Sequence, residues 1–238
     1  MNSKNKKVPE SKVGGKVIIQ QQPDGSNKVT FVENEYKFAF ELRNAARVMV
    51  NLAKNTKESS NTRYHYNAYI NSAIVLSYAS LEASFNEIIH IHALSDKSHL
   101  NEPEKKAIYT IRKEELIPKS DSHVLNNFNM LLRIIGKPEL YPGNRIYQNA
   151  NLVRILRNMI VHPVPGRVVT YKDDNNYDYS SQQDIAKKLR SALKLKKTAI
   201  FPRDIITSKC AEWAVSSCES FLHAFVVKSG IDVGFITD

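Results

Sequence analysis

Apolar residues recur at intervals of three and four along most of the chain, which is the spacing of one face of an α-helix. The pattern begins near Glu35, and proline or glycine separates many of the successive runs. The segment 67–93 is apolar on several sides, so we expect it at the centre of the fold. The sequence predicts a mainly α fold, a multi-helix bundle, with helices over about 35–53, 67–93, 101–112, 124–135, 146–162, 182–195 and 204–228.

The N-terminal part departs from this pattern. Residues 1–15 are polar and rich in lysine, so we expect a disordered basic leader. Residues 16–34 contain two β-type runs around a Pro-Asp-Gly-Ser turn at 23–26, which predicts a small β-hairpin. The polar stretch 164–180 predicts a loop or a short hairpin. Because there is no internal repeat and no long linker, we expect residues 35–238 to form one helical domain.

The predicted helix 146–162 carries the most informative chemistry. At about 100° per residue its side chains separate into two sectors. We expect the apolar sector to face the core, with Val153 at its margin; its members are Leu152, Ile155, Leu156, Met159 and Ile160. The polar sector combines Arg154, Arg157, Asn158 and His162, with Val161 among them. A planar cation, an amide and an imidazole on one face suit a phosphate ester.

Two stretches of the chain resemble the HEPN superfamily (higher eukaryotes and prokaryotes nucleotide-binding). Residues 157–162 read R-N-x-x-x-H, which is similar to the family's Arg-x(4–6)-His signature. Residues 77–89, with Leu81-Glu82-Ala83, are similar to the long early helix of larger HEPN-like proteins of the RiboL-PSP-HEPN kind. The resemblance covers about residues 35–228. It implies a helical bundle, usually dimeric, which in many members is a metal-independent endoribonuclease of toxins or phage defence and in others a non-catalytic binding or scaffold module.

The resemblance also implies roles for individual residues. His162 would act as general base or acid when an RNA 2′-hydroxyl attacks its own phosphate, Arg157 would hold that phosphate, and Asn158 would orient the histidine or the substrate. Arg157 and His162 lie about 140° apart around a helix, so in a HEPN-type homodimer Arg157 of one subunit would serve His162 of the other. No metal or other cofactor would be needed.

Glu82 lies on the most apolar predicted helix, where a buried carboxylate needs a partner. Arg157 or Arg154 could be that partner, and Glu82 would then orient the arginine from behind. Simpler interpretations stay open at this stage. Glu82 could lie at a solvent margin, Arg157 could be solvated, and His162, which precedes Pro163, could only cap the end of its helix.

Charge, cysteine content and hydropathy bear on the partner and the cellular location of the protein. The net charge of +10 and the pI near 9.5 favour a polyanionic partner such as RNA, although lysines in the leader and over 187–197 could be only solvated. Cys210 and Cys218 lie about 12 Å apart on one predicted helix, too far for a disulfide, which is typical of a reducing compartment. No apolar run could span a membrane and no secretory signal precedes the domain, so we expect a cytoplasmic location.

Other candidate sites are weaker. The spacing of His90, His92 and His99 does not suit a metal ion. Tyrosines 171, 177 and 179 could stack on bases or be incidental. The sequence thus favours a dimeric endoribonuclease, a toxin or defence effector that a partner protein could neutralise. A non-catalytic module that binds nucleic acid, a nucleotide or a protein is the alternative, followed by a purely structural helical protein.

Overall fold

The computed structural model describes residues 15–21, 27–33, 38–57, 59–94, 101–113, 124–162 and 180–231. Its contacts divide the chain into two compact units, Met1–Lys37 and Phe38–Asp238. The predicted leader, apart from Gly15, and residues 164–179 of the loop predicted over 164–180 lie outside the described residues, and so do Tyr171, Tyr177 and Tyr179.

The first unit contains two strands, in the segment for which the sequence predicts a hairpin. Strand β1 (Gly15–Gln21) pairs antiparallel with β2 (Asn27–Glu33), so that Val17 lies opposite Phe31 and Ile19 opposite Val29. Residues of high β-propensity are common in both strands: valine and isoleucine in β1, and valine, threonine and phenylalanine in β2.

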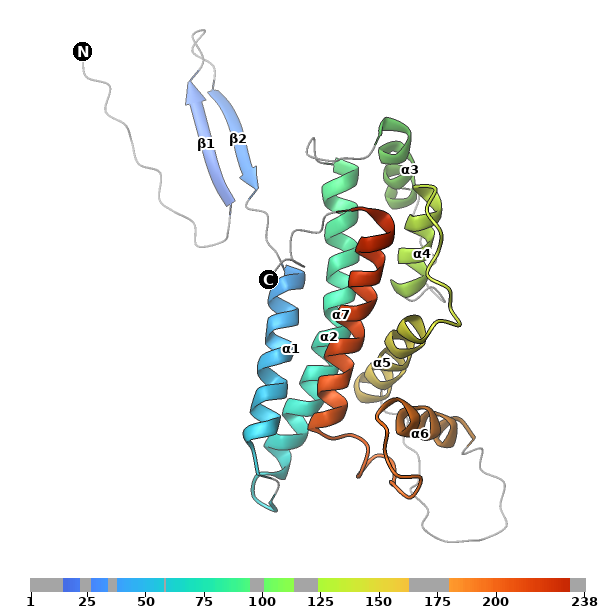
Figure 1. The fold of residues 1–238 in the computed structure, drawn as a ribbon. Coiled ribbons are helices and arrows are strands. Elements are labelled where there is room, and N and C mark those ends of the chain that lie inside the picture. Colours follow the sequence, from blue (N-terminus) through green and yellow to red (C-terminus); the bar gives the residue numbers. More distant parts are fainter. Residues whose placement is uncertain are drawn as a thin grey trace, which may run out of the picture. The chain divides into compact units, whose positions relative to one another are not determined.

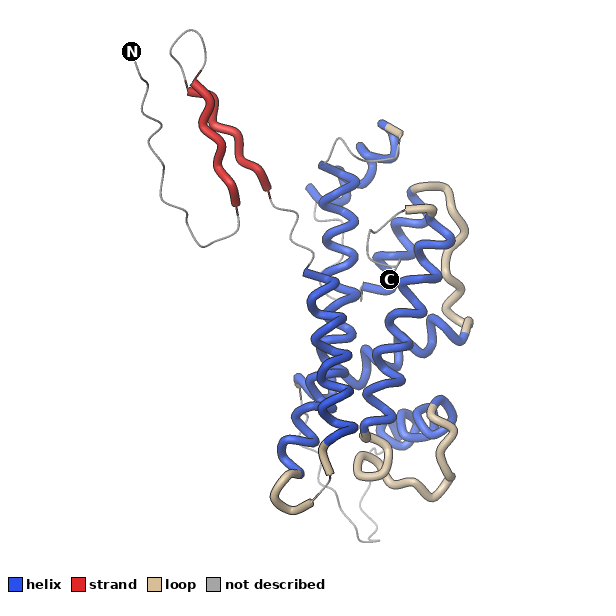
Figure 2. The backbone as a smooth tube through the Cα atoms, turned by 60° about the vertical axis from the view of Figure 1, so that its left-hand side comes forward, coloured by secondary structure: helices blue, strands red, loops and turns tan. Residues whose placement is uncertain are grey.

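The second unit is a helical bundle built around one long helix. Helix α2 (Arg63–Leu94) packs against α1 (Phe38–Asn55) and α7 (Ser208–Ser229), and the three run side by side (Figure 1). Helices α3 (Glu102–Lys113), α4 (Val124–Ile134) and α5 (Arg145–Val161) also contact α2, while α6 (Ser180–Ala192) packs on α5. Figure 2 shows the same helices from another side. The prediction that this helix lies at the centre of the fold, because it is apolar on several sides, is confirmed.

Aromatic side chains hold α2, α4 and α7 together. Phe128 of α4 is fully buried and makes edge-on contacts with Phe85 at 5.3 Å, Phe221 at 5.5 Å and Phe225 at 4.7 Å between ring centroids. Such contacts stabilise a core beyond the burial of their area. Helix α5 packs against this cluster, since Tyr147 of α5 makes an edge-on contact with Phe221.

The connection from α4 to α5 is fixed by polar contacts. Gly136 has a φ of 67°, the left-handed conformation that ends a helix. The buried side chain of Asn129 donates to the carbonyl of Leu140 at 2.9 Å and accepts from its N–H at 2.8 Å. Asn144 then caps α5 by accepting the N–H of Ile146 at 3.0 Å. The start of α5 therefore agrees with the predicted one to within one residue.

Two helix starts differ from the predicted ones by four residues. Helix α2 begins four residues early, because Ser59 and Thr62 exchange side-chain and backbone hydrogen bonds of 3.1 and 3.3 Å that cap its first turn. Helix α7 begins at Ser208 instead of about residue 204, because the Asp204 carboxylate accepts the N–H of Ile200 at 2.9 Å and closes a turn. Within the described residues, every helix is too short or too polar to cross a membrane.

Candidate functional site

Helix α5 buries only part of the face that was expected: Leu152 and Leu156 are buried as predicted, but the buried face is turned toward Val153. Its fully or nearly buried residues include Tyr147, Ala150, Val153 and Leu156, spaced three apart, which belong to the core that α5 shares with α2 and α7. Val153 was expected at the margin of this face and is instead fully buried. Three residues expected at its centre are only half-buried: Ile155, Met159 and Ile160.

This rotation brings Arg157 toward the core. Arg157 follows Val153 by four residues and Ala150 by seven, so it continues the buried stripe of α5. Its side chain is 26% exposed, so Arg157 lies at the edge of the core and not on the side of α5 directly opposite it. The apolar arc of this helix is wide enough to allow either orientation, and packing against α2 and α7 decided between them.

A carboxylate of α2 lies beside this partly buried arginine. Glu82 Oε2 is 3.8 Å from Arg157 Nη2, and the two side chains are 41% and 26% exposed. Glu82 therefore lies half-exposed at the edge of the α2–α5 interface and still faces the arginine. Of the two partners that the sequence offers, Arg157 makes the contact. Arg154 instead donates from Nε to Asn151 Oδ1 at 2.9 Å.

Most donors of the Arg157 guanidinium are uncommitted. Nη1 donates to the Asn158 side-chain oxygen at 3.0 Å, and Nε is buried and lacks a hydrogen-bond partner among the described residues. The 3.8 Å contact with Glu82 is too long for a hydrogen bond. A guanidinium has five N–H donors. The N–H groups of its two terminal nitrogens, Nη1 and Nη2, are the ones that can bind two phosphate oxygens at once.

Tyr78 completes this polar cluster. It lies one turn before Glu82 on α2, and its buried hydroxyl has no hydrogen-bond partner in the described part of the chain. Burial raises the pKa of Tyr78 well above its usual range, and the negative charge of Glu82 raises it further, while Arg154 and Arg157 oppose the rise. The sequence analysis gave Tyr78 no functional role. Its four-residue spacing from Glu82 is the signal that could have indicated one.

His162 lies apart from this cluster. It is the C-cap of α5, with φ −123° and ψ 67°, and its side chain is exposed. Its backbone N–H donates to the Asn158 carbonyl at 2.8 Å. The imidazole makes no hydrogen bond with another described residue. Asn158 thus binds both motif residues, Arg157 through its side chain and His162 through its backbone, but the two functional groups point in different directions around the helix axis.

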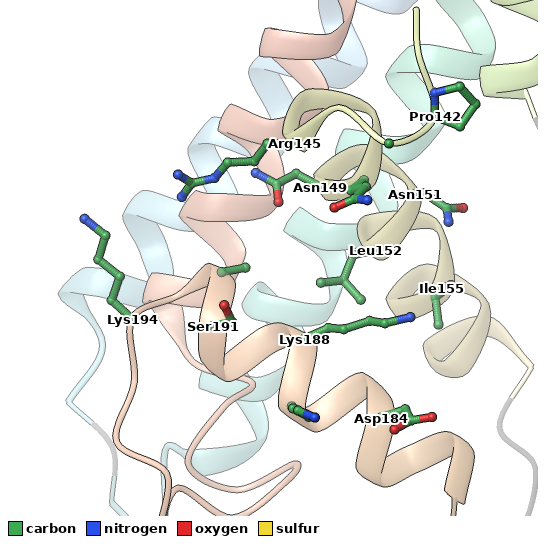
Figure 3. A pocket seen from close by; sticks show the side chains of 14 residues that line it. Pro142, Arg145, Asn149, Asn151, Leu152, Ile155, Asp184, Lys188, Ser191 and Lys194 are labelled. Atoms are coloured by element: carbon green, nitrogen blue, oxygen red, sulfur yellow. The ribbon is translucent and has the colours of Figure 1, made fainter.

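A groove lies on the other side of α5, against α6. Its volume is about 1060 Å³, and Arg145 and three lysines lie along it together with a single carboxylate, Asp184 (Figure 3). The lysines are Lys187, Lys188 and Lys194. Leu152, Ile155 and Ala192 form apolar parts of its wall, and three amides also line it: Gln148, Asn149 and Asn151. The lysines are evident in the sequence, whereas the groove depends on the packing of α6 against α5.

The described residues contain no group of three metal-binding side chains close enough to hold an ion. His90 lies on α2, whereas the side chains of His92 and His99 lie outside the described residues. Cys210 and Cys218 are free, buried thiols. No protein-family model, curated protein or solved structure matches this chain.

Proposed function

We propose that this protein is a metal-independent endoribonuclease with a HEPN-like helical bundle. The proposal rests above all on the end of α5, where a guanidinium is held beside a carboxylate, makes a single hydrogen bond to another described residue, and lies about one turn from an exposed imidazole. The basic net charge of +10 is consistent with a polyanionic substrate.

The proposed reaction is an internal transfer of a phosphoryl group in RNA. The 2′-oxygen forms a bond to the adjacent phosphorus, its proton passes to a base, and the bond from phosphorus to the 5′-oxygen breaks as that oxygen gains a proton. The products are a 2′,3′-cyclic phosphate and a 5′-hydroxyl. His162 acts as base or acid, and Arg157 stabilises the charge that develops on the phosphate.

In this proposal the complete site forms between two copies of the chain. Arg157 and His162 are separated by about 140° around α5, and Arg157 is directed toward α2. In a two-fold dimer, Arg157 of one protomer and His162 of its partner act on one phosphate. Asn158 fixes both residues to the same helix end, and Glu82 positions Arg157.

Cleavage assays test the proposal directly. The purified protein in EDTA should cut a fluorescent RNA oligonucleotide and leave the matching DNA intact, because DNA lacks the attacking hydroxyl. Mass spectrometry should find the cyclic phosphate on the upstream product. Cleavage of both nucleic acids, or absence of any RNA cleavage over a broad set of RNA sequences, would overturn it.

A mixing experiment tests the shared site. Arg157→Ala and His162→Ala should each be inactive as pure proteins. After co-expression, about a quarter of the wild-type activity should return, since half of the dimers are mixed and each mixed dimer keeps one intact site. If no activity returns while mixed dimers form, the site lies within one protomer.

The groove supports a second candidate, an RNA-binding module without catalysis. Its four cations are present whether or not Arg157 and His162 meet. RNA binding that weakens steeply with salt, with no cleavage under any condition, would favour this alternative.

A further inference from the structure

We infer that the groove between α5 and α6 binds the phosphate backbone of an unpaired RNA strand and leads it toward His162. The inference deepens the proposed function, on which its link to cleavage rests, by naming where the substrate lies outside the reacting phosphate. It involves a surface that the R-N-x-x-x-H motif does not include.

The charge of the groove is the first observation. Arg145, Lys187, Lys188 and Lys194 lie along the groove with a single carboxylate, Asp184, and none of the four makes an ion pair with another described residue. Several cations elsewhere in the bundle are neutralised: Arg47 by Glu219, Lys54 by Glu212 and Arg133 by Glu139. Unpaired cations on two facing helices concentrate positive potential where a chain of phosphates can lie.

The uncharged part of the wall is the second observation. The partly buried Ile155 lines the groove beside the amides of Gln148, Asn149 and Asn151, with the buried Leu152 behind it, and Lys188 extends from α6 in the direction of Ile155 (Figure 3). Amides can hydrogen-bond base edges, and aliphatic carbon can cover base faces, but only when the bases are not paired in a duplex. The volume of about 1060 Å³ is at the upper limit for small-molecule sites, which suits several nucleotides.

The course of α5 is the third observation. His162 follows Ile155 by seven residues, so it projects within about 20° of Ile155 and about 10 Å further along the axis. Asn151, Ile155 and His162 therefore form one row on α5. The groove also contacts Arg154, whose Nε donates a hydrogen bond to the groove residue Asn151. A strand in the groove thus continues toward the exposed imidazole.

Binding of a 2′-O-methyl RNA oligonucleotide, which cannot be cleaved, tests the inference. Fluorescence anisotropy should show that Lys187→Ala/Lys188→Ala raises Kd about tenfold and lowers the salt slope by about 1.4, the value for two phosphate contacts on a single strand. Lys196→Ala/Lys197→Ala is the matched control, since it removes the same charge from exposed residues outside the groove. Arg145→Gln, on the opposite wall, should weaken binding independently of any change in α6.

The outcomes separate this inference from the proposed nuclease. Equal weakening by both double variants, or equal competition by polyglutamate and by unlabelled RNA, would overturn a groove specific for RNA. Preferred weakening by the groove variants without any cleavage by the wild type would retain the groove and refute the nuclease. Cleavage and binding that both ignore the groove variants would leave the nuclease and refute the groove.

Discussion

Glu82 Oε2 lies 3.8 Å from Arg157 Nη2, across the contact between α2 and α5. The separation gives electrostatic attraction without a hydrogen bond, so it directs the guanidinium and leaves its donors free. Because the two side chains are 41% and 26% exposed, the pair contributes at most about 1 kcal/mol to stability. The main effect of this ion pair is therefore to orient the Arg157 side chain, and not to stabilise the fold.

Glu82→Gln should lower RNA cleavage without unfolding the bundle. We expect kcat to fall about tenfold, since loss of the charge releases Arg157, and the free energy of unfolding to change by less than about 1 kcal/mol. Cleavage kinetics and urea denaturation measure both effects.

Glu219→Gln is the matched control, because Glu219 pairs with the exposed Arg47 on α1. It should leave cleavage unchanged. Glu82→Asp, which keeps the charge, should recover part of the lost rate. If Glu82→Gln and Glu219→Gln behave alike, Glu82 does not position Arg157.

His162→Ala should reduce kcat by about 10²–10⁴, the usual contribution of a general acid or base. Its exposed position at the end of α5 means that thermal stability should hardly change. His223→Ala, at an exposed position on α7, serves as the control and should retain full activity. Activity that survives the loss of His162 would remove the imidazole from the reaction.

Arg157→Lys should be nearly as inactive as Arg157→Ala. Lysine keeps the positive charge but loses the planar donors that bind two phosphate oxygens at once. Substrate titrations should show the loss mainly in kcat, because the donors stabilise charge that grows in the transition state. Full activity in Arg157→Lys would mean that charge alone is needed.

Phe128→Ala should destabilise the helical unit by about 3–5 kcal/mol, as expected for a large cavity in a packed core. Phe128 is fully buried and contacts three other rings, so its neighbours cannot easily close the space. Val227→Ala, at a site that is 69% exposed, should cost less than about 0.5 kcal/mol. Chemical denaturation of both variants provides the comparison.

The two thiols should resist alkylation in the folded protein at pH 8. Burial raises the pKa of Cys210 and of Cys218 to about 12, whereas an unfolded thiol has a pKa of about 8.5. Because the folded pKa is the higher one, the folded state retains these protons. The resulting stability is complete below about pH 8.5 and is lost as the pH rises toward 12.

Mass spectrometry after iodoacetamide treatment should find both cysteines unmodified in the native protein and modified in denaturant. The unfolding temperature should fall between pH 8 and pH 10.5, with Tyr78 acting in the same direction because burial also raises its pKa. Rapid labelling of the native protein would show that α7 is not packed as described.

The helices can be predicted from the amino-acid sequence alone, since their apolar periodicity and many of their ends are local properties. Gly136 ends α4 because glycine adopts the left-handed conformation at little cost. Asn144 caps α5 by accepting the N–H of Ile146, two residues further along the chain. The pairing of Glu82 with an arginine could also be anticipated, because a carboxylate among apolar residues needs a counter-charge. The start of α7 could not be predicted in this way, because the Asp204 side chain closes a turn with Ile200 and the helix begins four residues later than its apolar pattern indicates.

The rotation of α5 about its own axis depends on its packing against the other helices. Its apolar arc could bury either Ile155 or Val153 most deeply, and the shapes of α2 and α7 selected Val153, which carried Arg157 inward and left Ile155 to the groove. The groove itself depends on two helices separated by a long stretch of chain. Periodicity specifies which residues share a helix face, but the neighbour that covers each face is set by packing among all the helices at once.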